Sequence, residues 1–316
     1  MRRGLILVAL VMAGVVGLGA VGCAPEAEER EVSVRVATSL PPHGWLIECV
    51  GGDRVGVVVT LPGAASHATY TPTDRQVSGV LRCGVYFRAG VPFERGGWFS
   101  AIEGSGSVAV VDLREGIALR RMEAHRHHDE EGHDHAHDHG HGHGHGHGDG
   151  AEGYEDPHTW LSPANLIAQA GVVRKVLTRV DPAGAEVYAA NHGALVTALG
   201  ALDRELMLTL TPVRGRAFFV FHPSWGYFAE RYGLRQVAIE TEGKDPTDRE
   251  LTALQNRARA EGIGVVFVQP QIAGRGAAAV AGAIGARVAV IDPMRADVVA
   301  NLREVAAALL SSGQQE

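Results

Sequence analysis

The stretch from Ala183 to Leu210, AGAEVYAANHGALVTALGALDRELMLTL, divides the chain into two parts. It contains no proline, and its apolar residues recur near helical spacing, at Val187, Leu195, Leu199, Leu202, Leu206 and Leu210. Asp181-Pro182 precedes it and Thr211-Pro212 ends it. The pattern predicts a single helix about 42 Å long, at roughly 1.5 Å per residue, which is long enough to cross two domains.

Short apolar segments alternate with helical patterns on both sides of this helix. Before it, strands are expected at residues 32–38, 55–61, 85–87 and 108–113, with helices at 45–50, 73–81 and 163–179. After it, strands are expected at 217–221, 236–240, 265–269 and 288–291, with helices at 227–232, 248–261, 276–284 and 297–310. Such alternation is typical of parallel sheets. The sequence therefore predicts two α/β lobes with parallel sheets, residues 32–180 and 212–316, joined by one long rigid helix within 181–211.

Composition excludes several classes of protein. The formal net charge is −7 over 316 residues, so no basic field is available to hold nucleic acid. Three cysteines are too few for a disulfide-dense mini-protein or a four-cysteine zinc ribbon. Cys49 and Cys83 are left as either a disulfide or two buried thiols, and the sequence favours neither.

The N-terminus carries an export signal. Arg2 and Arg3 precede an uncharged apolar run, which predicts a signal peptide over residues 1–22. Ala20-Val21-Gly22-Cys23 resembles a lipobox, so Cys23 is expected to carry a lipid anchor, followed by a tether over 23–31. A plain cleaved signal and an uncleaved membrane anchor are the alternatives. All three place the folded part outside the cytoplasm, in the periplasm or at the cell surface.

Histidines are concentrated in one segment. Eleven of the sixteen lie between His125 and His147, mixed with Asp, Glu and Gly. This composition cannot form a core, so a disordered histidine-rich loop is expected over residues 121–153. It is interpreted as a weak, multivalent collector of metal ions, with an inert low-complexity segment as the alternative.

Four other residues form a candidate metal site. They follow expected strands or precede a helix, where ligand groups of parallel α/β sheets gather: His67, His158, His222 and Asp292. Three imidazoles and one carboxylate suit Zn²⁺ in a cleft between the lobes, whereas a site rich in carboxylates would favour manganese. Because imidazoles bind metal only when neutral, affinity should fall as pH drops through roughly 6. His43 is expected in a turn and His192 on the solvent side of the long helix.

These residues lie within motifs that resemble the cluster A-I family of ABC-transporter solute-binding proteins, in its zinc-binding, ZnuA-like branch. The motifs are Pro-Gly-x-x-x-His-x-x-Tyr-x-Pro-x-Asp from Pro62, Asp-Pro-His-x-Trp-Leu-Ser-Pro from Asp156, and His-Pro-Ser-x-Gly-Tyr-Phe from His222. The resemblance implies His67, His158 and His222 as ligands and Asp292 as a fourth. Ser66 departs from the family, in which proline often precedes the first ligand. The family also implies modest domain tilting on metal exchange.

The resemblance implies a monomeric binding protein that captures Zn²⁺ and delivers it to an ABC permease, with no enzymatic activity. A zinc buffer or adhesin without a transporter is the alternative. A secreted zinc hydrolase is disfavoured, because four protein ligands would close the site and no His-Glu-x-x-His motif occurs. Glu240 and Glu242, the acids available as a general base, are expected in a solvated loop.

Overall fold

The computed structural model describes residues 32–63, 65–122, 155–240, 246–271 and 274–312. The expected signal peptide, the tether with Cys23 and residues 123–153 of the expected histidine-rich loop lie outside the described residues. Arg121, the first residue of that expected loop, forms an isolated antiparallel bridge with Glu155. None of the helices within the described ranges has both the length and the apolar character needed to cross a bilayer.

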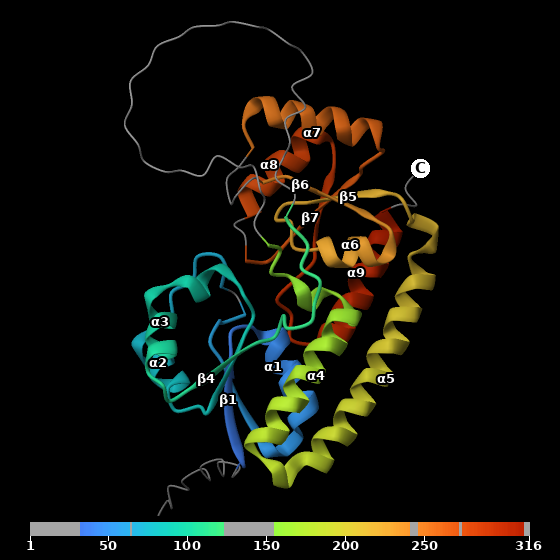
Figure 1. The fold of residues 1–316 in the computed structure, drawn as a ribbon. Helices are drawn as coiled ribbons and strands as arrows, with labels where there is room; N and C mark the ends of the chain where they lie inside the picture. Colours follow the sequence, from blue (N-terminus) through green and yellow to red (C-terminus); the bar gives the residue numbers. More distant parts are fainter. Residues whose placement is uncertain (1–31, 64, 123–154, 241–245, 272–273, 313–316) are drawn as a thin grey trace, which may run out of the picture. The chain divides into compact units, whose positions relative to one another are not determined.

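Two four-stranded parallel sheets are present, as expected from the alternation of strands and helices (Figure 1). The first sheet has the order β2-β1-β3-β4 and the second the order β6-β5-β7-β8. The first half of the chain contains β1 (Val34–Thr38), α1 (Pro41–Gly51), β2 (Val55–Val59), α2 (Asp74–Val80), β3 (Val85–Arg88), α3 (Gly97–Gly104), β4 (Ala109–Asp112) and α4 (Pro163–Val180). After α5 (Ala185–Thr209) follow β5 (Ala217–Val220), α6 (Gly226–Tyr232), β6 (Arg235–Ala238), α7 (Asp248–Ala260), β7 (Val265–Val268), α8 (Gly274–Ile284), β8 (Arg287–Val290) and α9 (Val298–Ser312).

Helix α5 is the long helix expected from the sequence, and α4 lies alongside it (Figure 1). Its buried stripe is Tyr188, Leu195, Leu199, Leu202 and Leu206. Val187, which the helical spacing predicts on that stripe, is 44% exposed. The aromatic ring of Tyr188 occupies the buried position instead, because a shift of one residue turns a helical side chain by about 100°.

Ion pairs attach α5 to both halves of the fold. Before the helix, Arg54 Nε and Nη2 donate to Asp181 at 2.8 and 3.0 Å. Farther along, Arg303 Nη2 in α9 donates to Glu205 at 2.7 Å. One continuous hydrophobic cluster also runs from the first half through the helix to the second, with Leu46, Leu199 and Leu302 all fully buried. This shared core favours small adjustments between the halves over wide opening.

Several local expectations need correction. Helix α3 was not expected, because a glycine at each end masked its short amphipathic pattern. His43 lies within α1, which Pro41 opens, and so is not a turn residue. The sequence left the state of Cys49 and Cys83 open, and in the structure both are free thiols, with Cys83 buried.

Candidate metal centre

Three of the four sequence-predicted ligands come from three separate loops. His67 lies between β2 and α2, His158 directly precedes the 3-10 turn Thr159–Leu161, and His222 follows β5. The backbone of the first loop is held in place by a hydrogen bond from Phe93 N to the carbonyl of His67, at 3.3 Å. His158 and His222 therefore lie next to regular elements, whereas His67 lies eight residues after the end of β2.

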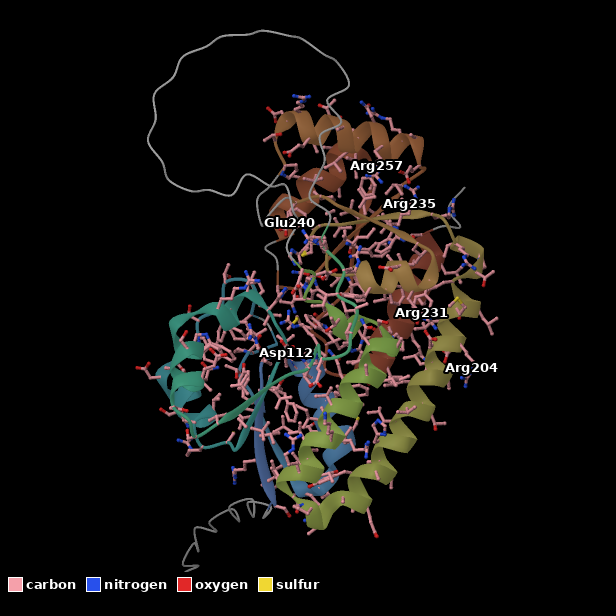
Figure 2. The ribbon with its side chains drawn as sticks, in the orientation of Figure 1. Asp112, Arg204, Arg231, Arg235, Glu240 and Arg257 are labelled. Carbon is pink, nitrogen blue, oxygen red and sulfur yellow. The ribbon has the colours of Figure 1, made fainter. Side chains whose placement is uncertain are left out.

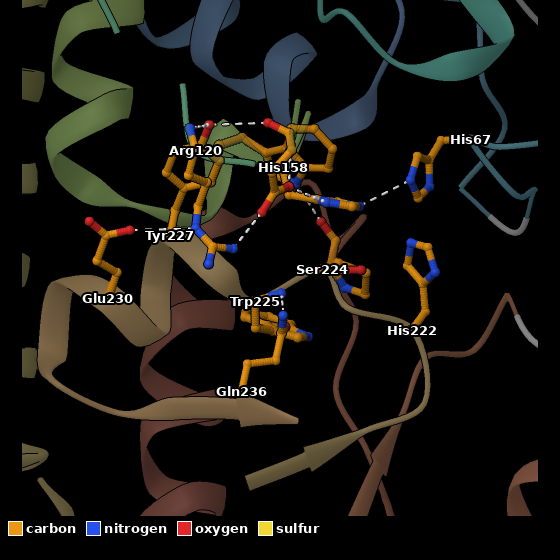
Figure 3. Close-up of polar contacts among 12 residues, drawn as sticks. His67, Arg120, His158, His222, Ser224, Trp225, Tyr227, Glu230 and Gln236 are labelled. Carbon is orange, nitrogen blue, oxygen red and sulfur yellow. Dashed lines mark hydrogen bonds and ion pairs between the residues drawn. The ribbon is translucent and has the colours of Figure 1, made fainter. Parts of the chain in front are cut away.

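The three imidazole rings face one another (Figure 3). One ring nitrogen of each lies within 4.8 Å of the other two, and no other described His, Cys, Asp or Glu side chain joins this group. Nε2 of His158 is 3.1 Å from Nε2 of His67. Two nitrogens bound to one tetrahedral Zn²⁺, each at about 2.0–2.1 Å, would be roughly 3.3 Å apart. The spacing therefore fits a shared ion.

Burial keeps two of the three rings, His67 and His158, uncharged. His67 is 3% exposed and His158 is 1% exposed. Burial holds the pKa of His67 well below its usual range, and the neighbouring imidazoles His158 and His222 add to the effect. Burial also lowers the pKa of His158, although Asp156 opposes the shift. Neutral imidazole is the form that binds metal, so these rings are ready to bind at neutral pH.

Two carboxylates contact two of the rings at Nδ1. Asp156 Oδ1 accepts a hydrogen bond from His158 Nδ1 at 2.7 Å and from its backbone N at 3.0 Å. Glu240 Oε1 is paired with Nδ1 of His222. With Nδ1 engaged, Nε2 of each ring is the remaining candidate donor for a metal ion, and Nε2 of His222 is buried without a hydrogen-bond partner. This is the arrangement in which outer carboxylates orient histidine ligands.

Glu240 corrects one sequence-based interpretation. It follows β6 (Figure 2) and is 7% exposed, so it does not lie in a solvated loop. The strand order explains why Glu240 lies near His222. Strands β5 and β6 are neighbours, and their carboxyl ends meet at one sheet edge. Glu242 lies outside the described residues.

Asp292, the fourth predicted ligand, is not part of the three-histidine cluster. It follows β8, and its Oδ1 accepts hydrogen bonds from Gln271 Nε2 and Met294 N, both at 2.9 Å. Gln271 Nε2 also donates to the carbonyl of Gly63 at 2.9 Å, in the loop that carries His67. The Asp292 carboxylate is therefore linked through Gln271 to the loop that carries His67.

The two remaining histidines lie outside the cluster. His192 is half-buried on α5 rather than facing solvent. His43 is fully buried, and burial lowers its pKa to about 3. The centroid of its ring lies 5.5 Å from the ring centroid of Trp160. The ring centroid of Trp160 lies 5.3 Å from that of His158.

Together these features define a two-lobed α/β protein with a buried three-imidazole candidate site for a transition-metal ion. Over residues 36–309 the chain matches the family described as ZnuA, zinc-uptake complex component A, periplasmic. The chain belongs to this family.

Curated relatives agree with the family match. The high-affinity zinc uptake system protein ZnuA of Paracoccus denitrificans is 40% identical over 114 residues, which is 35% of each chain. The zinc-binding protein AdcA of Streptococcus pyogenes is 26% identical over 200 residues, covering 61% of this chain and 35% of AdcA. The matched parts therefore span about a third of these relatives.

Solved structures match more completely. A crystal structure of ZnuA aligns with a TM-score of 0.77 and 33% identity, covering 89% of this chain and 99% of that chain. A zinc-bound ZnuA deletion mutant aligns with the same TM-score and 31% identity, covering 90% and 99%. The laminin-binding adhesin Lmb of Streptococcus agalactiae, at 21% identity and a TM-score of 0.72 over 88% of this chain and 99% of that chain, shares the fold.

Proposed function

We propose that this protein binds one Zn²⁺ tightly outside the cytoplasm and delivers it to an ABC permease. The observation that carries the proposal is the convergence of three buried ring nitrogens within 4.8 Å. Three nitrogen donors suit Zn²⁺ better than manganese, which prefers oxygen. The names of the ZnuA relatives, which refer to zinc uptake, support the transport role.

His67, His158 and His222 are the proposed ligands, and Asp292 is proposed to complete the coordination. The hydrogen bonds that anchor the Asp292 side chain end on Oδ1, so Oδ2 is the oxygen proposed to reach the ion. Three neutral imidazoles and one carboxylate would leave the occupied site with a net charge of about +1. Four protein ligands would leave no open position for the water on which catalytic zinc sites depend.

A binding role, rather than hydrolysis, is also favoured by Glu240. Its carboxylate is paired with Nδ1 of His222. Glu240 therefore orients a proposed zinc ligand and is not available to activate a water molecule. The protein is proposed to act as a monomer. The anchor at Cys23 is supported by the lipobox-like sequence before it.

Two experiments test this function. Competition with a chromophoric chelator should show one tight zinc equivalent in the wild-type protein and none in His158→Ala. In the source organism, loss of the gene should reduce zinc uptake from zinc-limited medium, and wild-type protein should restore uptake while His158→Ala should not. Normal uptake without the gene would leave a zinc buffer or an adhesin as the function.

A further inference from the structure

Arg120 connects the candidate metal centre to the opposite half of the fold. Its Nη1 donates to Asp156 Oδ2 at 2.8 Å, and Asp156 in turn accepts from Nδ1 of His158 (Figure 3). On its other side Arg120 reaches α6: its Nε is 3.4 Å from Glu230 Oε2, and its guanidinium carbon is 5.8 Å from the ring centroid of Tyr227. One side chain therefore contacts both the support of a proposed ligand and the second half of the chain.

The Asp156 carboxylate needs this cation. Its side chain is fully buried, and an unpaired buried carboxylate is costly. When His158 is neutral, Arg120 is the only full positive charge paired with this carboxylate among the ion pairs of the described residues.

The protein leaves space for the guanidinium. A Cβ at Gly226, the first residue of α6, would lie 1.4 Å from Arg120 Nη1 and 2.8 Å from Asp156 Oδ2. Any other residue at this position would displace the guanidinium group or the carboxylate. The start of α6 is therefore shaped around the Arg120–Asp156 contact.

The backbone on either side of the histidine-rich segment is fixed at the same point. The hydroxyl of Tyr227 accepts a hydrogen bond from Arg120 N and donates to the carbonyl of Asp156, both at 3.1 Å. Asp156 N donates to the carbonyl of Arg120 at 2.9 Å. These bonds hold the two backbone segments together, so the position of Arg120 relative to Asp156 is defined by more than one ion pair.

We propose that Arg120 is a positioning residue for the zinc ion: it fixes the Asp156 carboxylate and so directs Nε2 of His158 toward the metal. The inference rests on the proposed function. It adds that the orientation of a ligand in the first half depends on an arginine seated against α6 of the second half. A small shift of α6 would then change the metal site without any ligand leaving its loop.

The test compares Arg120→Met, which keeps the bulk of the side chain but removes its charge, with Arg120→Lys, which keeps a charge without the planar fork. Glu230→Gln is the matched control, because it alters the 72%-exposed partner of Arg120 and leaves the Asp156 contact in place. Zinc affinity is measured by chelator competition. The absorption spectrum of the Co²⁺-substituted protein reports coordination geometry, and thermal unfolding of the metal-free protein reports stability.

Arg120→Met should weaken zinc binding about 10-fold or more and change the Co²⁺ spectrum, as expected for loss of an outer-shell support. Arg120→Lys should recover part of the affinity, and Glu230→Gln should match the wild type. Wild-type affinity and spectrum in Arg120→Met would overturn the inference. So would a loss of thermal stability with an unchanged Co²⁺ spectrum, since that result indicates a purely structural ion pair.

His158→Ala, measured alongside, separates this inference from the proposed function. If His158→Ala abolishes tight binding while Arg120→Met does not weaken it, only the role of Arg120 is wrong. If His158→Ala still binds zinc tightly, the proposed site itself is wrong.

Discussion

Nε2 of His67 lies 3.1 Å from Nε2 of His158, although 91 positions separate the two residues in the sequence. Without metal, one of these nitrogens must carry a proton and donate it to the other. A zinc ion bound by both requires a lone pair on each, and therefore a proton on each Nδ1. Asp156 already fixes that tautomer for His158, so metal binding requires a tautomer change only at His67.

His158→Ala should abolish the tight zinc equivalent, with affinity lower by orders of magnitude, because it removes a ligand rather than an outer-shell support. Isothermal titration calorimetry measures the change. His192→Ala is the matched control: His192 is also a histidine outside the loop, but it lies on α5 and should bind as the wild type does. High affinity retained in His158→Ala would count against the assignment.

Asp292→Asn should weaken zinc binding, because it replaces the anionic ligand with a neutral amide. The asparagine Oδ1 still accepts from Gln271 and Met294, so the fold should be retained. Chelator competition should show a loss larger than that of Glu240→Gln, for which about 10- to 100-fold is expected of an outer-shell support. Unchanged affinity in Asp292→Asn would mean that water or Glu240 completes the coordination.

Deletion of residues 126–148 should remove extra weak zinc equivalents and keep one tight equivalent. The reason is that the proposed ligands and the contacts of Arg120 with Asp156 all lie outside the deleted segment. Zinc titration of the full-length and deleted proteins counts both the weak and the tight zinc equivalents. Loss of the tight equivalent would place part of the primary site within the segment.

His43 should make folding stability depend on pH. Burial lowers its pKa to about 3 from a usual value of 6.5, so the unfolded chain binds this proton more readily than the folded protein does. Stability is therefore lost as pH falls below about 6.5 and continues to fall toward pH 3. Between pH 7.5 and 5.5 the loss from this residue is about 1.4 kcal/mol.

Urea unfolding of metal-free wild-type protein and His43→Leu at both pH values isolates this contribution. The drop in unfolding free energy between pH 7.5 and 5.5 should be smaller in His43→Leu by about 1.4 kcal/mol. An equal drop in both proteins would show that His43 titrates normally when folded.

The depressed pKa values of His67 and His158 also revise one expectation. From sequence alone, zinc affinity was expected to fall as pH drops through roughly 6. Because burial keeps both rings neutral below their usual range, protonation of His67 and His158 should compete with zinc only at a lower pH than that.

Features that depend on hydrophobic periodicity and on residue type at strand ends could be predicted from the sequence. The alternation of strands and helices predicted both parallel sheets, and the rarity of histidine outside residues 125–147 drew attention to His67, His158 and His222. The buried stripe of α5 was predicted except at Val187, where spacing alone did not distinguish two adjacent positions.

What the sequence did not show are contacts between residues far apart in the chain. Arg120 belongs to no recognised motif, and its contact with α6 depends on the space left by Gly226. His43 follows two prolines, which suggested a turn, whereas Pro41 instead begins a helix. The pairing of Glu240 with His222 required the strand order of the second sheet.

Zinc K-edge anomalous diffraction from crystals of the zinc-loaded protein shows directly whether the three histidines share one zinc ion. We expect one strong anomalous peak about 2.0–2.1 Å from a ring nitrogen of each of His67, His158 and His222. A peak bound elsewhere, with these three nitrogens beyond bonding distance of any shared ion, would contradict the shared site.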